Sequence, residues 1–428
     1  MNQSFGVDSI CSPEIGLYIH VPFCDHICGY CDFYKLYRKP ESPIYERFTR
    51  ALIQEVKLRS ERDWGNRKIG TTLLGGGTPS YLATGQLERI FAAISAHFDI
   101  SNLKECTIEI NPGTVDTDKL RAFRQMGISR ASFGVQAFQD HVLKAADRIH
   151  DAKLAVRGVE QAFQAGFTNI NVDLLYGIPG QAESDWQASL RQAVELPIQH
   201  ISLYNLTYEK GTPFYHLREK GTLQPVREKL EQRFYDHAID YMEKTGFHRY
   251  EVSNYARPGF DCLHNLGCWN LQPYLGMGPS AHSFDCNKRF WNSPNLNAYI
   301  RNLEKGHLAP CGGEILTEKM RLEEWVSLRL RQVKGIVIGE LKDKFGIEIQ
   351  DWRGEMAAQF GRDWNKWLNY DGQSISLTEQ GFWLSDEILP KFLQWLQPHL
   401  RRTDPEENGM EEKGKWKRPH SQPAVSGE

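Results

Sequence analysis

Short apolar segments alternate with longer amphipathic segments through the first half of the chain. The apolar segments have the length and composition of buried strands, whereas the amphipathic segments repeat their apolar positions at helical spacing. The pattern predicts six strand-then-helix units in about 230 residues. The predicted strands cover residues 16–22, 69–76, 106–112, 131–136, 170–179 and 200–207. The predicted helices cover residues 43–59, 84–97, 116–126, a stretch ending near 165, 183–196 and 227–244.

Strands that are apolar on both faces indicate a parallel sheet covered by helices, so the fold class is α/β. Six units are too few for a closed eightfold barrel. We therefore expect a curved, partly open (β/α)6 barrel over residues 14–255 and favour it over a flat, doubly wound sheet.

The rest of the chain has a different pattern. Residues 1–13 form a variable N-terminus, and residues 256–317, rich in Gly, Pro and aromatics, form a loop-dominated connecting region. Residues 318–400 predict a second, mostly helical domain, whose short helices and small strand pair suit a winged-helix-like module. Residues 401–428 carry dense mixed charge with few apolar side chains, so this tail is expected to be disordered.

Distinctive residues recur where the predicted strands end. Cys24, Cys28 and Cys31 follow the first strand, and Gly75–Gly77 end the second. Glu109, Gln136 and Asp173 lie at or near the ends of the third, fourth and fifth strands. Because α/β proteins build their sites at the carboxyl ends of parallel strands, these residues are expected to meet in one site.

Overall charge and composition exclude several classes of partner. The 428 residues carry 51 basic and 54 acidic side chains, a net charge of −3, so no global field recruits nucleic acid or an anionic membrane. No apolar run reaches the roughly 18 residues that a membrane helix needs, and the first residues lack the features of a signal peptide. Nine cysteines, several of them scattered, do not suggest a disulfide framework. A cytoplasmic location is expected.

The stretch HVPFCDHICGYCDF places three cysteines in the pattern C-x3-C-x2-C. A structural zinc site would need a fourth ligand, which His20 or His26 could supply, and three free thiols are another alternative. Three thiolates on a four-iron cluster would leave one iron open to a further ligand. We favour the iron–sulfur cluster.

This cysteine motif, with Tyr30 before its third cysteine, resembles that of the radical S-adenosylmethionine (SAM) superfamily. The resemblance implies a [4Fe-4S] cluster whose open iron binds SAM, and a reduced cluster that cleaves SAM to a 5′-deoxyadenosyl radical. The segment LLGGGTPS matches the stretch that contacts the methionyl end of SAM in this superfamily. It makes Gly75, Gly76, Gly77 and Thr78 candidate SAM-binding residues.

The similarity extends from about Ile15 to Leu400 and is to the oxygen-independent coproporphyrinogen III oxidase family, with NVDLLYGIPGQ, EVSNYARPGF and LTEQG among the matching segments. It implies that Glu109, Gln136, Arg148 and Asp173 bind SAM, with the carboxylates on ribose hydroxyls and Arg148 on the SAM carboxylate. Tyr18 matches a tyrosine near the sulfonium.

Two branches of this family differ in their motifs. Oxidases extend the cysteine motif to C-x3-C-x2-C-x-C, whereas this chain has Phe33 at the last position and resembles the haem chaperone (HemW) branch. That branch also carries H-N-x-x-Y-W, associated with haem binding. Here the matching residues are His264, Asn265, Cys268 and Trp269, with Cys268 in place of the tyrosine. An imidazole can ligate haem iron, Cys268 is a candidate thiolate ligand, and a structural role for His264 is the alternative.

The resemblance implies a radical-SAM-type protein that binds a cluster, SAM and haem and transfers haem to an acceptor protein. The alternative is oxidative decarboxylation of coproporphyrinogen III to protoporphyrinogen IX, and a third hypothesis is a radical SAM enzyme on another substrate. Haem or a porphyrinogen, a haem-accepting protein and an electron donor such as flavodoxin or ferredoxin are the expected partners. Whether SAM is cleaved in turnover is left open, and no catalytic residue is assigned.

Overall fold

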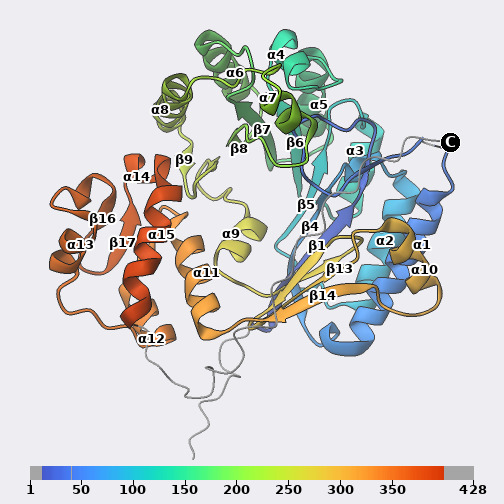
Figure 1. Ribbon diagram of the computed structural model, residues 1–428. Helices are drawn as coiled ribbons and strands as arrows, with labels where there is room; N and C mark the ends of the chain where they lie inside the picture. Colours follow the sequence, from blue (N-terminus) through green and yellow to red (C-terminus); the bar gives the residue numbers. More distant parts are fainter. Residues whose placement is uncertain (1–11, 40, 400–428) are drawn as a thin grey trace, which may run out of the picture.

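The computed structural model describes residues 12–39 and 41–399. The predictions for the first residues of the N-terminus and for the tail from 401 lie outside this range. Figure 1 shows a large α/β unit, coloured blue to yellow, beside a smaller unit coloured orange to red. No helix in the described part of the chain is long and apolar enough to cross a membrane.

The centre of the large unit is a run of six mutually parallel strands in the order β1-β4-β5-β6-β7-β8. Their side chains are buried almost throughout, which explains their nearly continuous apolar sequences. The predicted α/β fold with a partial (β/α)6 barrel is confirmed. The strands are β1 (Glu14–Val21), β4 (Lys68–Gly76), β5 (Glu105–Ile110), β6 (Arg130–Gln136), β7 (Ile170–Tyr176) and β8 (His200–Asn205).

Helices connect these strands and cover the outer face of the sheet (Figure 1). Asp116 and Asp151 begin two of them by accepting a hydrogen bond from the backbone nitrogen three residues later. Their apolar faces join the strands in one large core. The helical elements are α1 (Ile44–Arg59), η2 (Ser60–Trp64), η3 (Pro79–Tyr81), α2 (Thr84–His97), α3 (Thr117–Gln125), α4 (Asp140–Ala145), α5 (Ala152–Gln164), α6 (Glu183–Glu195), α7 (Pro213–Glu219) and α8 (Glu228–Lys244).

The connecting region is not dominated by loops, contrary to the expectation from sequence. β11 adds to the free edge of β1 in parallel, and β12, β13 and β14 continue the sheet antiparallel to one another. The region also contains helices α9 and α10. At the opposite edge of the sheet, β10 pairs with β8 and β9 pairs with β10, which completes a 12-stranded sheet. The elements are β9 (His248–Arg249), β10 (Asn254–Ala256), α9 (Leu263–Trp269), β11 (Tyr274–Met277), β12 (His282–Asp285), β13 (Lys288–Asn292), α10 (Leu296–Glu304) and β14 (Pro310–Ile315).

Close backbone packing explains why these strands do not resemble strands in sequence. A Cβ at Gly276 would lie 2.0 Å from the carbonyl oxygen of His282, so β11 and the start of β12 approach each other only through a glycine. Gly278 has a φ of +99°, and a Cβ there would lie 2.3 Å from the carbonyl oxygen of His20. Glycines that usually indicate loops are required here by the sheet itself.

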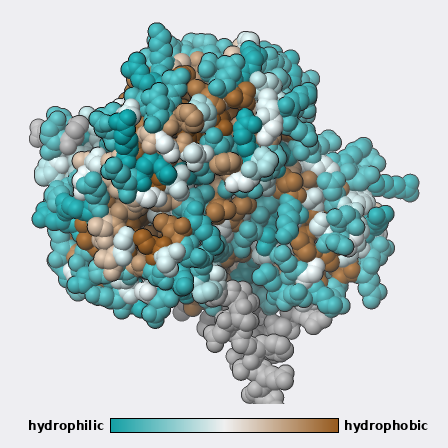
Figure 2. Space-filling view, turned by 180° about the vertical axis from the view of Figure 1, so that it is seen from behind, coloured by the Kyte–Doolittle hydropathy of each residue, from teal (hydrophilic) through white to brown (hydrophobic). Residues whose placement is uncertain are grey.

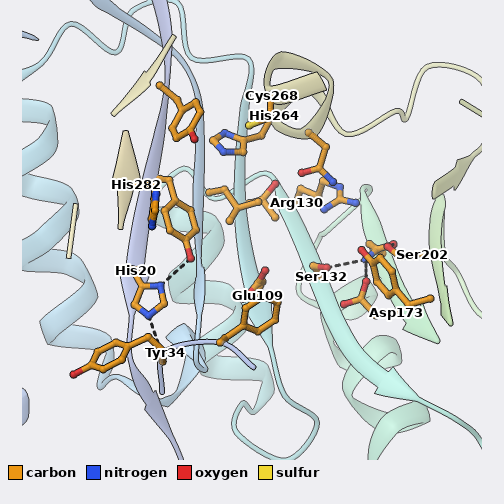
Figure 3. A pocket seen from close by; sticks show the side chains of 18 of the residues that line it. His20, Tyr34, Glu109, Arg130, Ser132, Asp173, Ser202, His264, Cys268 and His282 are labelled. Atoms are coloured by element: carbon orange, nitrogen blue, oxygen red, sulfur yellow. Dashed lines mark hydrogen bonds between the residues drawn. The ribbon is translucent and has the colours of Figure 1, made fainter. Parts of the chain in front are cut away.

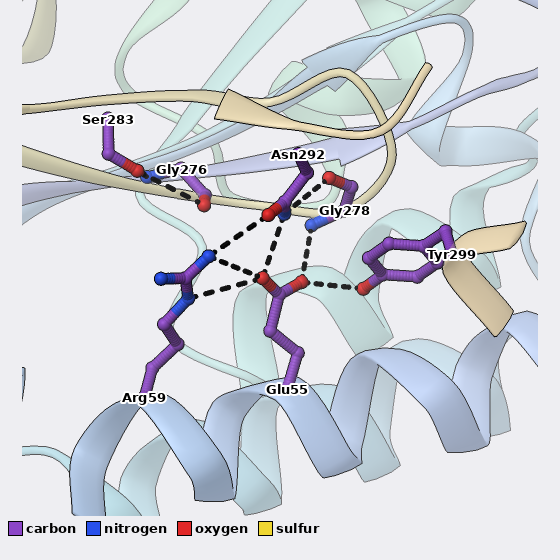
Figure 4. A network of polar contacts seen from close by, with 7 residues as sticks. All are labelled: Glu55, Arg59, Gly276, Gly278, Ser283, Asn292 and Tyr299. Atoms are coloured by element: carbon purple, nitrogen blue, oxygen red, sulfur yellow. Dashed lines mark hydrogen bonds and ion pairs between the residues drawn. The ribbon is translucent and has the colours of Figure 1, made fainter. Parts of the chain in front are cut away.

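A buried polar network ties this region to α1 (Figure 4). Glu55 is fully buried and forms an ion pair with Arg59 at 3.3 Å. The Glu55 carboxylate also accepts hydrogen bonds from Asn292 Nδ2, Tyr299 Oη and the backbone nitrogen of Gly278, at 2.8, 2.6 and 2.9 Å. Each buried charge therefore has several partners, as burial requires.

The smaller unit has its own apolar core and a three-stranded antiparallel sheet in the order β15-β17-β16. Short helices with a small sheet agree with the predicted mostly helical, winged-helix-like domain. It contacts the barrel through Arg249, which pairs with Glu379 at 2.6 Å and lies over the Phe382 ring at 4.1 Å. The elements are α11 (Glu318–Leu330), β15 (Ile336–Val337), α12 (Ile338–Phe345), α13 (Trp352–Phe360), η4 (Trp364–Lys366), β16 (Leu368–Tyr370), β17 (Ser374–Leu377), α14 (Glu379–Trp383), α15 (Ser385–Leu396) and η5 (Gln397–His399).

The surface opposite to the view of Figure 1 is mostly hydrophilic, and apolar side chains gather on it in separate patches (Figure 2). Phe33 is the notable exposed aromatic near the carboxyl ends of the barrel strands, with 70% of its surface accessible. It belongs to the loop that carries the three cysteines.

Candidate functional site

The three cysteines lie on the loop between β1 and α1, at the carboxyl end of the barrel. A short parallel pair, β2 (Phe23–Cys24) and β3 (Leu36–Tyr37), brackets the loop. Cys24 and Cys28 are buried and Cys31 is half-buried, and all three are free thiols. Burial raises the pKa of the Cys24 thiol to about 11, so a bound cation is needed to hold it as a thiolate. All three cysteines line one cavity.

Residues from distant segments hold this loop in place. Asp147, in a left-handed conformation after α4, accepts a hydrogen bond from the Gly29 nitrogen at 2.8 Å and pairs with His26 at 3.1 Å. The Phe214 ring covers the loop, and a Cβ at Gly29 would lie 2.5 Å from this ring. Sequence reasoning missed Asp147 and Phe214. The only indications in the sequence are that Asp147 directly precedes Arg148 and that Phe214 lies in α7.

Arg148 lies against the cysteine loop. Its Nη1 donates to the Cys28 sulfur at 3.3 Å, and its Nη2 donates to Asn111 Oδ1 at 2.9 Å and to the Gly134 carbonyl at 3.0 Å. Its Nε is buried without a partner. Asn111, which sequence reasoning also missed, in turn donates to Thr78 Oγ1, and Thr78 donates to the Cys24 sulfur.

The two histidines that could complete a structural zinc site contact other groups. Within the described ranges, no group of three or more His, Cys, Asp or Glu side chains could hold one ion together. Zinc requires all its ligands within about 2.3 Å of one centre, whereas the cysteines of a cluster bind separate irons. His20 and His26, the candidate fourth zinc ligands, contact the Tyr34 carbonyl and Asp147 instead.

A cavity of about 600 Å³ opens beside the three cysteines, and we call it the cluster cavity. Most of the predicted SAM-binding residues line it together with the cysteines. Tyr18 and Gly75 are not in its lining. The residues of the prediction that line it are Gly76, Gly77, Thr78, Glu109, Gln136, Arg148 and Asp173.

The glycines at the end of β4 and directly after it are required by the protein's own packing. A Cβ at Gly75 would lie 2.9 Å from the Glu109 carboxylate, and one at Gly77 would lie 2.7 Å from the Phe23 carbonyl oxygen. Gly76 has a φ of +106°, and a Cβ there would lie 2.5 Å from the His20 ring. Gly75 therefore positions Glu109, while Gly76 and Gly77 let the chain pass close to the cysteine loop and also face the cavity.

Glu109 and Asp173 are two half-buried carboxyl groups on the cavity wall. Burial raises the pKa of Glu109 to about 7, the nearby Asp173 adds to this, and the hydrogen bond from the Gly76 nitrogen opposes it. Burial also raises the pKa of Asp173, although Ser202 and Asn171 oppose the shift by hydrogen bonding. Carboxyl groups in such a position can accept hydrogen bonds from hydroxyl or cationic groups of a ligand.

Tyr18 and His20 lie on β1 and form a chain with the backbone of Tyr34. The Tyr18 hydroxyl contacts His20 Nδ1 at 3.0 Å, and His20 Nε2 contacts the Tyr34 carbonyl oxygen at 2.8 Å, so His20 donates from Nε2 and Tyr18 donates to Nδ1. Burial lowers the pKa of His20 to about 4, which keeps its ring neutral. Tyr18 faces a second cavity.

This inner cavity, of about 500 Å³, lies in the barrel interior and shares Phe33, Glu109, Ser132, Asp173 and Tyr204 with the cluster cavity. Three of the four residues of the predicted haem motif line it: His264, Asn265 and Cys268. Figure 3 shows His264 and Cys268 at α9. Trp269 is not in its lining. Tyr274 on β11 lines the cavity beside Cys268, whose pKa burial raises to about 11.

His264 is 5% exposed and held from two sides. Its Nδ1 contacts Thr71 Oγ1 at 3.0 Å, and its backbone nitrogen donates to the Glu105 carboxylate at 3.2 Å. Glu105 also accepts from the Leu263 nitrogen at 3.0 Å and so caps the first turn of α9. Burial lowers the pKa of His264 to about 4, so the ring is neutral and its Nε2 is the nitrogen available to an iron.

Known proteins are similar to this chain in sequence and in fold. A family described as the Radical SAM superfamily matches residues 18–193, and one described as the HemN C-terminal domain matches residues 316–384. The Heme chaperone HemW of Lactococcus lactis (strain IL1403) is 33% identical over 380 residues, which is 88% of this chain and 96% of that protein. The chain belongs to the HemW family.

A second HemW relative and a solved structure are also similar to this chain. The Heme chaperone HemW of Bacillus subtilis (strain 168) is 34% identical over 88% of this chain and 98% of that protein. The solved structure of coproporphyrinogen III oxidase (HemN) from Escherichia coli, described as a radical SAM enzyme, has a TM-score of 0.78 at 24% identity and covers 90% of this chain and 92% of that one. At this identity the likeness concerns the fold.

Membership of the radical SAM superfamily implies a [4Fe-4S] cluster and SAM as cofactors. The donor set fits both groups, because three cysteines face one cavity and the buried Nε of Arg148 has no partner there. Of the other cysteines in the described ranges, Cys106, Cys262 and Cys268 are free. Cys286 is disulfide-bonded.

Proposed function

We propose that this protein binds haem in its inner cavity and transfers it to an acceptor protein, with a [4Fe-4S] cluster and SAM in the cluster cavity. The observation that carries the proposal is the position of His264, Asn265 and Cys268 on one cavity. The relatives named heme chaperones match most of the chain, which supports the same function.

Cys24, Cys28 and Cys31 would hold the cluster, whose bound form supplies one-electron chemistry to SAM. Arg148 is the candidate partner of the SAM carboxylate, because its fork of donors suits a planar anion and its Nε is unfilled. Glu109 and Asp173 are placed to accept from ribose hydroxyls, and Gln136, in a left-handed conformation at the end of β6, lines the same wall. The Gly76, Gly77 and Thr78 segment would contact the methionyl end.

In the inner cavity, His264 would ligate the haem iron through Nε2, since Thr71 contacts Nδ1. A neutral ring is the form that binds a metal. Cys268 lies one helical turn further along α9, and its high pKa makes it a poor second ligand. Asn265 offers a polar contact from the same face, while Trp269 lies outside the cavity lining and would not cover the porphyrin in this structure.

A haem titration tests the proposal. Cluster-reconstituted protein is titrated anaerobically with haem and followed by absorbance, together with His264→Ala, Cys268→Ala and the exposed-surface control His307→Ala. We expect saturation near one haem per chain in the wild type, Cys268→Ala and His307→Ala, and much weaker binding in His264→Ala. Equal affinity in His264→Ala would contradict ligation by His264.

The second candidate function is oxidation of coproporphyrinogen III, which the HemN-like fold supports. Against it, Phe33 stands where the oxidase motif has a further cysteine, and this side chain is exposed at the mouth of both cavities. Incubation with coproporphyrinogen III, SAM and a reductant tests it. Formation of protoporphyrinogen IX would support the oxidase function.

We propose a cytoplasmic location, because a cluster on three free thiols requires a reducing compartment. A small electron-transfer protein such as a flavodoxin or a ferredoxin would reduce the cluster. Fractionation of cells that produce the protein, with a periplasmic marker as the control, tests the location. Reduction assays with each purified donor test the partner.

A further inference from the structure

Arg130 is a buried cation whose donors are unused in the structure. It begins β6, is 3% exposed, and lines the inner cavity (Figure 3). Its Nε is buried without a hydrogen-bond partner, and Arg130 takes part in none of the ion pairs among the described residues. A guanidinium carries five donors, and burying it without acceptors costs several kcal/mol.

Nearby carboxyl groups balance its charge but do not accept hydrogen bonds from it. Burial lowers the pKa of Arg130, and the carboxyl groups of Glu105 and Asp173 act in the opposite direction. The Glu105 carboxylate, however, is already engaged by the first turn of α9 and by the Cys262 thiol. Asp173 accepts from Asn171 Nδ2 at 2.8 Å. The guanidinium therefore needs an acceptor from outside the chain.

The surroundings of Arg130 are built for a polar group of a ligand. Ser132, Asn171 and Ser202 line the same cavity, and Asn171 Nδ2 donates to Ser132 Oγ at 2.7 Å, so these side chains are held in fixed positions. His264 lies close enough for the Arg130 charge to lower its pKa. The cation and the candidate iron ligand thus face one cavity from two elements, β6 and α9.

We propose that Arg130 binds a carboxylate of the ligand in the inner cavity, namely a propionate of haem, while His264 meets the iron. This inference rests on the proposed haem-carrier function. A guanidinium matches a carboxylate with two parallel hydrogen bonds, which a neutral or ester group cannot accept equally well. The carboxylate of SAM is the other source of the same chemistry, and the experiment separates the two.

Haem and haem dimethyl ester, which lacks free carboxylates, are titrated into cluster-reconstituted protein under anaerobic conditions. The proteins are the wild type, Arg130→Gln, Arg130→Lys and Arg157→Gln, the last being an exposed arginine on α5 that serves as the matched control. SAM affinity is measured on the same samples. Arg130→Lys keeps the charge that Glu105 and Asp173 face, so it is expected to fold even if Arg130→Gln does not.

We expect the wild type and Arg157→Gln to bind haem about 10- to 100-fold more tightly than the ester, the range that charge-assisted hydrogen bonds give. In Arg130→Gln the affinity for haem should fall to that for the ester, and the affinity for the ester should not change. Arg130→Lys should lose part of the preference. SAM affinity should stay the same in all variants.

Equal affinity of the wild type for haem and ester would overturn the role of Arg130 and leave haem binding standing. A loss of SAM affinity in Arg130→Gln with unchanged haem preference would assign the carboxylate to SAM and also overturn the inference. A purely structural Arg130 would lower the affinity for haem and ester by the same factor. No binding of either ligand by the wild type would overturn the haem-carrier function itself.

Discussion

Arg148 donates a hydrogen bond to the sulfur of Cys28 at 3.3 Å, across 120 positions of sequence. This contact joins the residue assigned to the SAM carboxylate directly to a candidate cluster ligand. Asp147, which precedes Arg148 in the sequence, accepts a hydrogen bond from the Gly29 nitrogen of the cysteine loop. The segment after α4 thus supports the cysteine loop from one side and faces the cluster cavity from the other.

Loss of a cysteine from the loop should abolish the cluster. Replacing Cys24, Cys28 or Cys31 with Ala leaves two thiolates, which are too few to hold four irons. We expect iron and sulfide content of the reconstituted protein to fall to background in each variant. Cys106→Ala, a buried free cysteine on β5, is the matched control and should keep full iron content. Full iron content in a loop variant would refute the assignment.

Arg148→Lys should weaken SAM binding and leave the cluster intact. Lysine keeps a positive charge beside Cys28 but loses the planar fork that suits a carboxylate. We expect SAM affinity to fall about 10- to 100-fold by isothermal titration, the range for a charge-assisted hydrogen bond. Iron content is measured in parallel, and unchanged SAM affinity would show that Arg148 has only its structural contacts.

Glu109 should make the stability of the protein depend on pH. Its pKa is raised from 4.5 to about 7 in the folded state, so the folded state binds this proton more tightly than the unfolded chain does. Stability should fall as pH rises from about 4.5 to about 7 and then level off. The shift corresponds to a loss on the order of 3 kcal/mol.

Glu109→Gln should remove this contribution. We expect the variant to gain stability relative to the wild type between pH 5 and pH 8, as measured by denaturant unfolding of anaerobic protein at each pH. Glu88→Gln, an exposed residue on α2, is the control and should follow the wild type. A constant difference between Glu109→Gln and the wild type across this range would show that Glu109 is ionised throughout.

Glu55→Ala should destabilise the protein strongly. The change leaves the Arg59 charge and the Asn292 and Tyr299 donors buried without their shared acceptor (Figure 4). Removing one partner of a buried ion pair costs about 3–5 kcal/mol. Urea unfolding measures the loss, and Glu61→Ala, whose ion pair with Lys57 is half exposed, should change stability by less than about 0.5 kcal/mol.

The strand-then-helix order of the barrel could be predicted, because each strand is buried on both faces and each helix on one. Burial of this kind leaves a local pattern of apolar residues. β11 to β14 could not be predicted in this way. They pack through glycines such as Gly276, and the need for a glycine is set by a distant backbone, not by neighbours in sequence.

The candidate site also has some features that the sequence predicts and others that it does not. The spacing of Cys24, Cys28 and Cys31 is local, so it carries its chemistry in the sequence alone, and the haem motif likewise falls within one short helix. Asp147, Asn111 and Phe214 were missed because a hydrogen bond or a ring contact between distant segments has no signature in either segment.

The sequence by itself determined the chemistry of this protein: three thiols on one loop, the carboxyl groups at strand ends, and an imidazole with a cysteine one turn later. Only the tertiary structure decided which of these groups share a cavity. It also decided that Trp269 lies outside the lining of the inner cavity and that Arg130 faces this cavity without a hydrogen-bond acceptor. The physical reason is that the side chain of a residue sets which kinds of bond it can form. Its burial and its distance from other groups depend on how the whole chain packs.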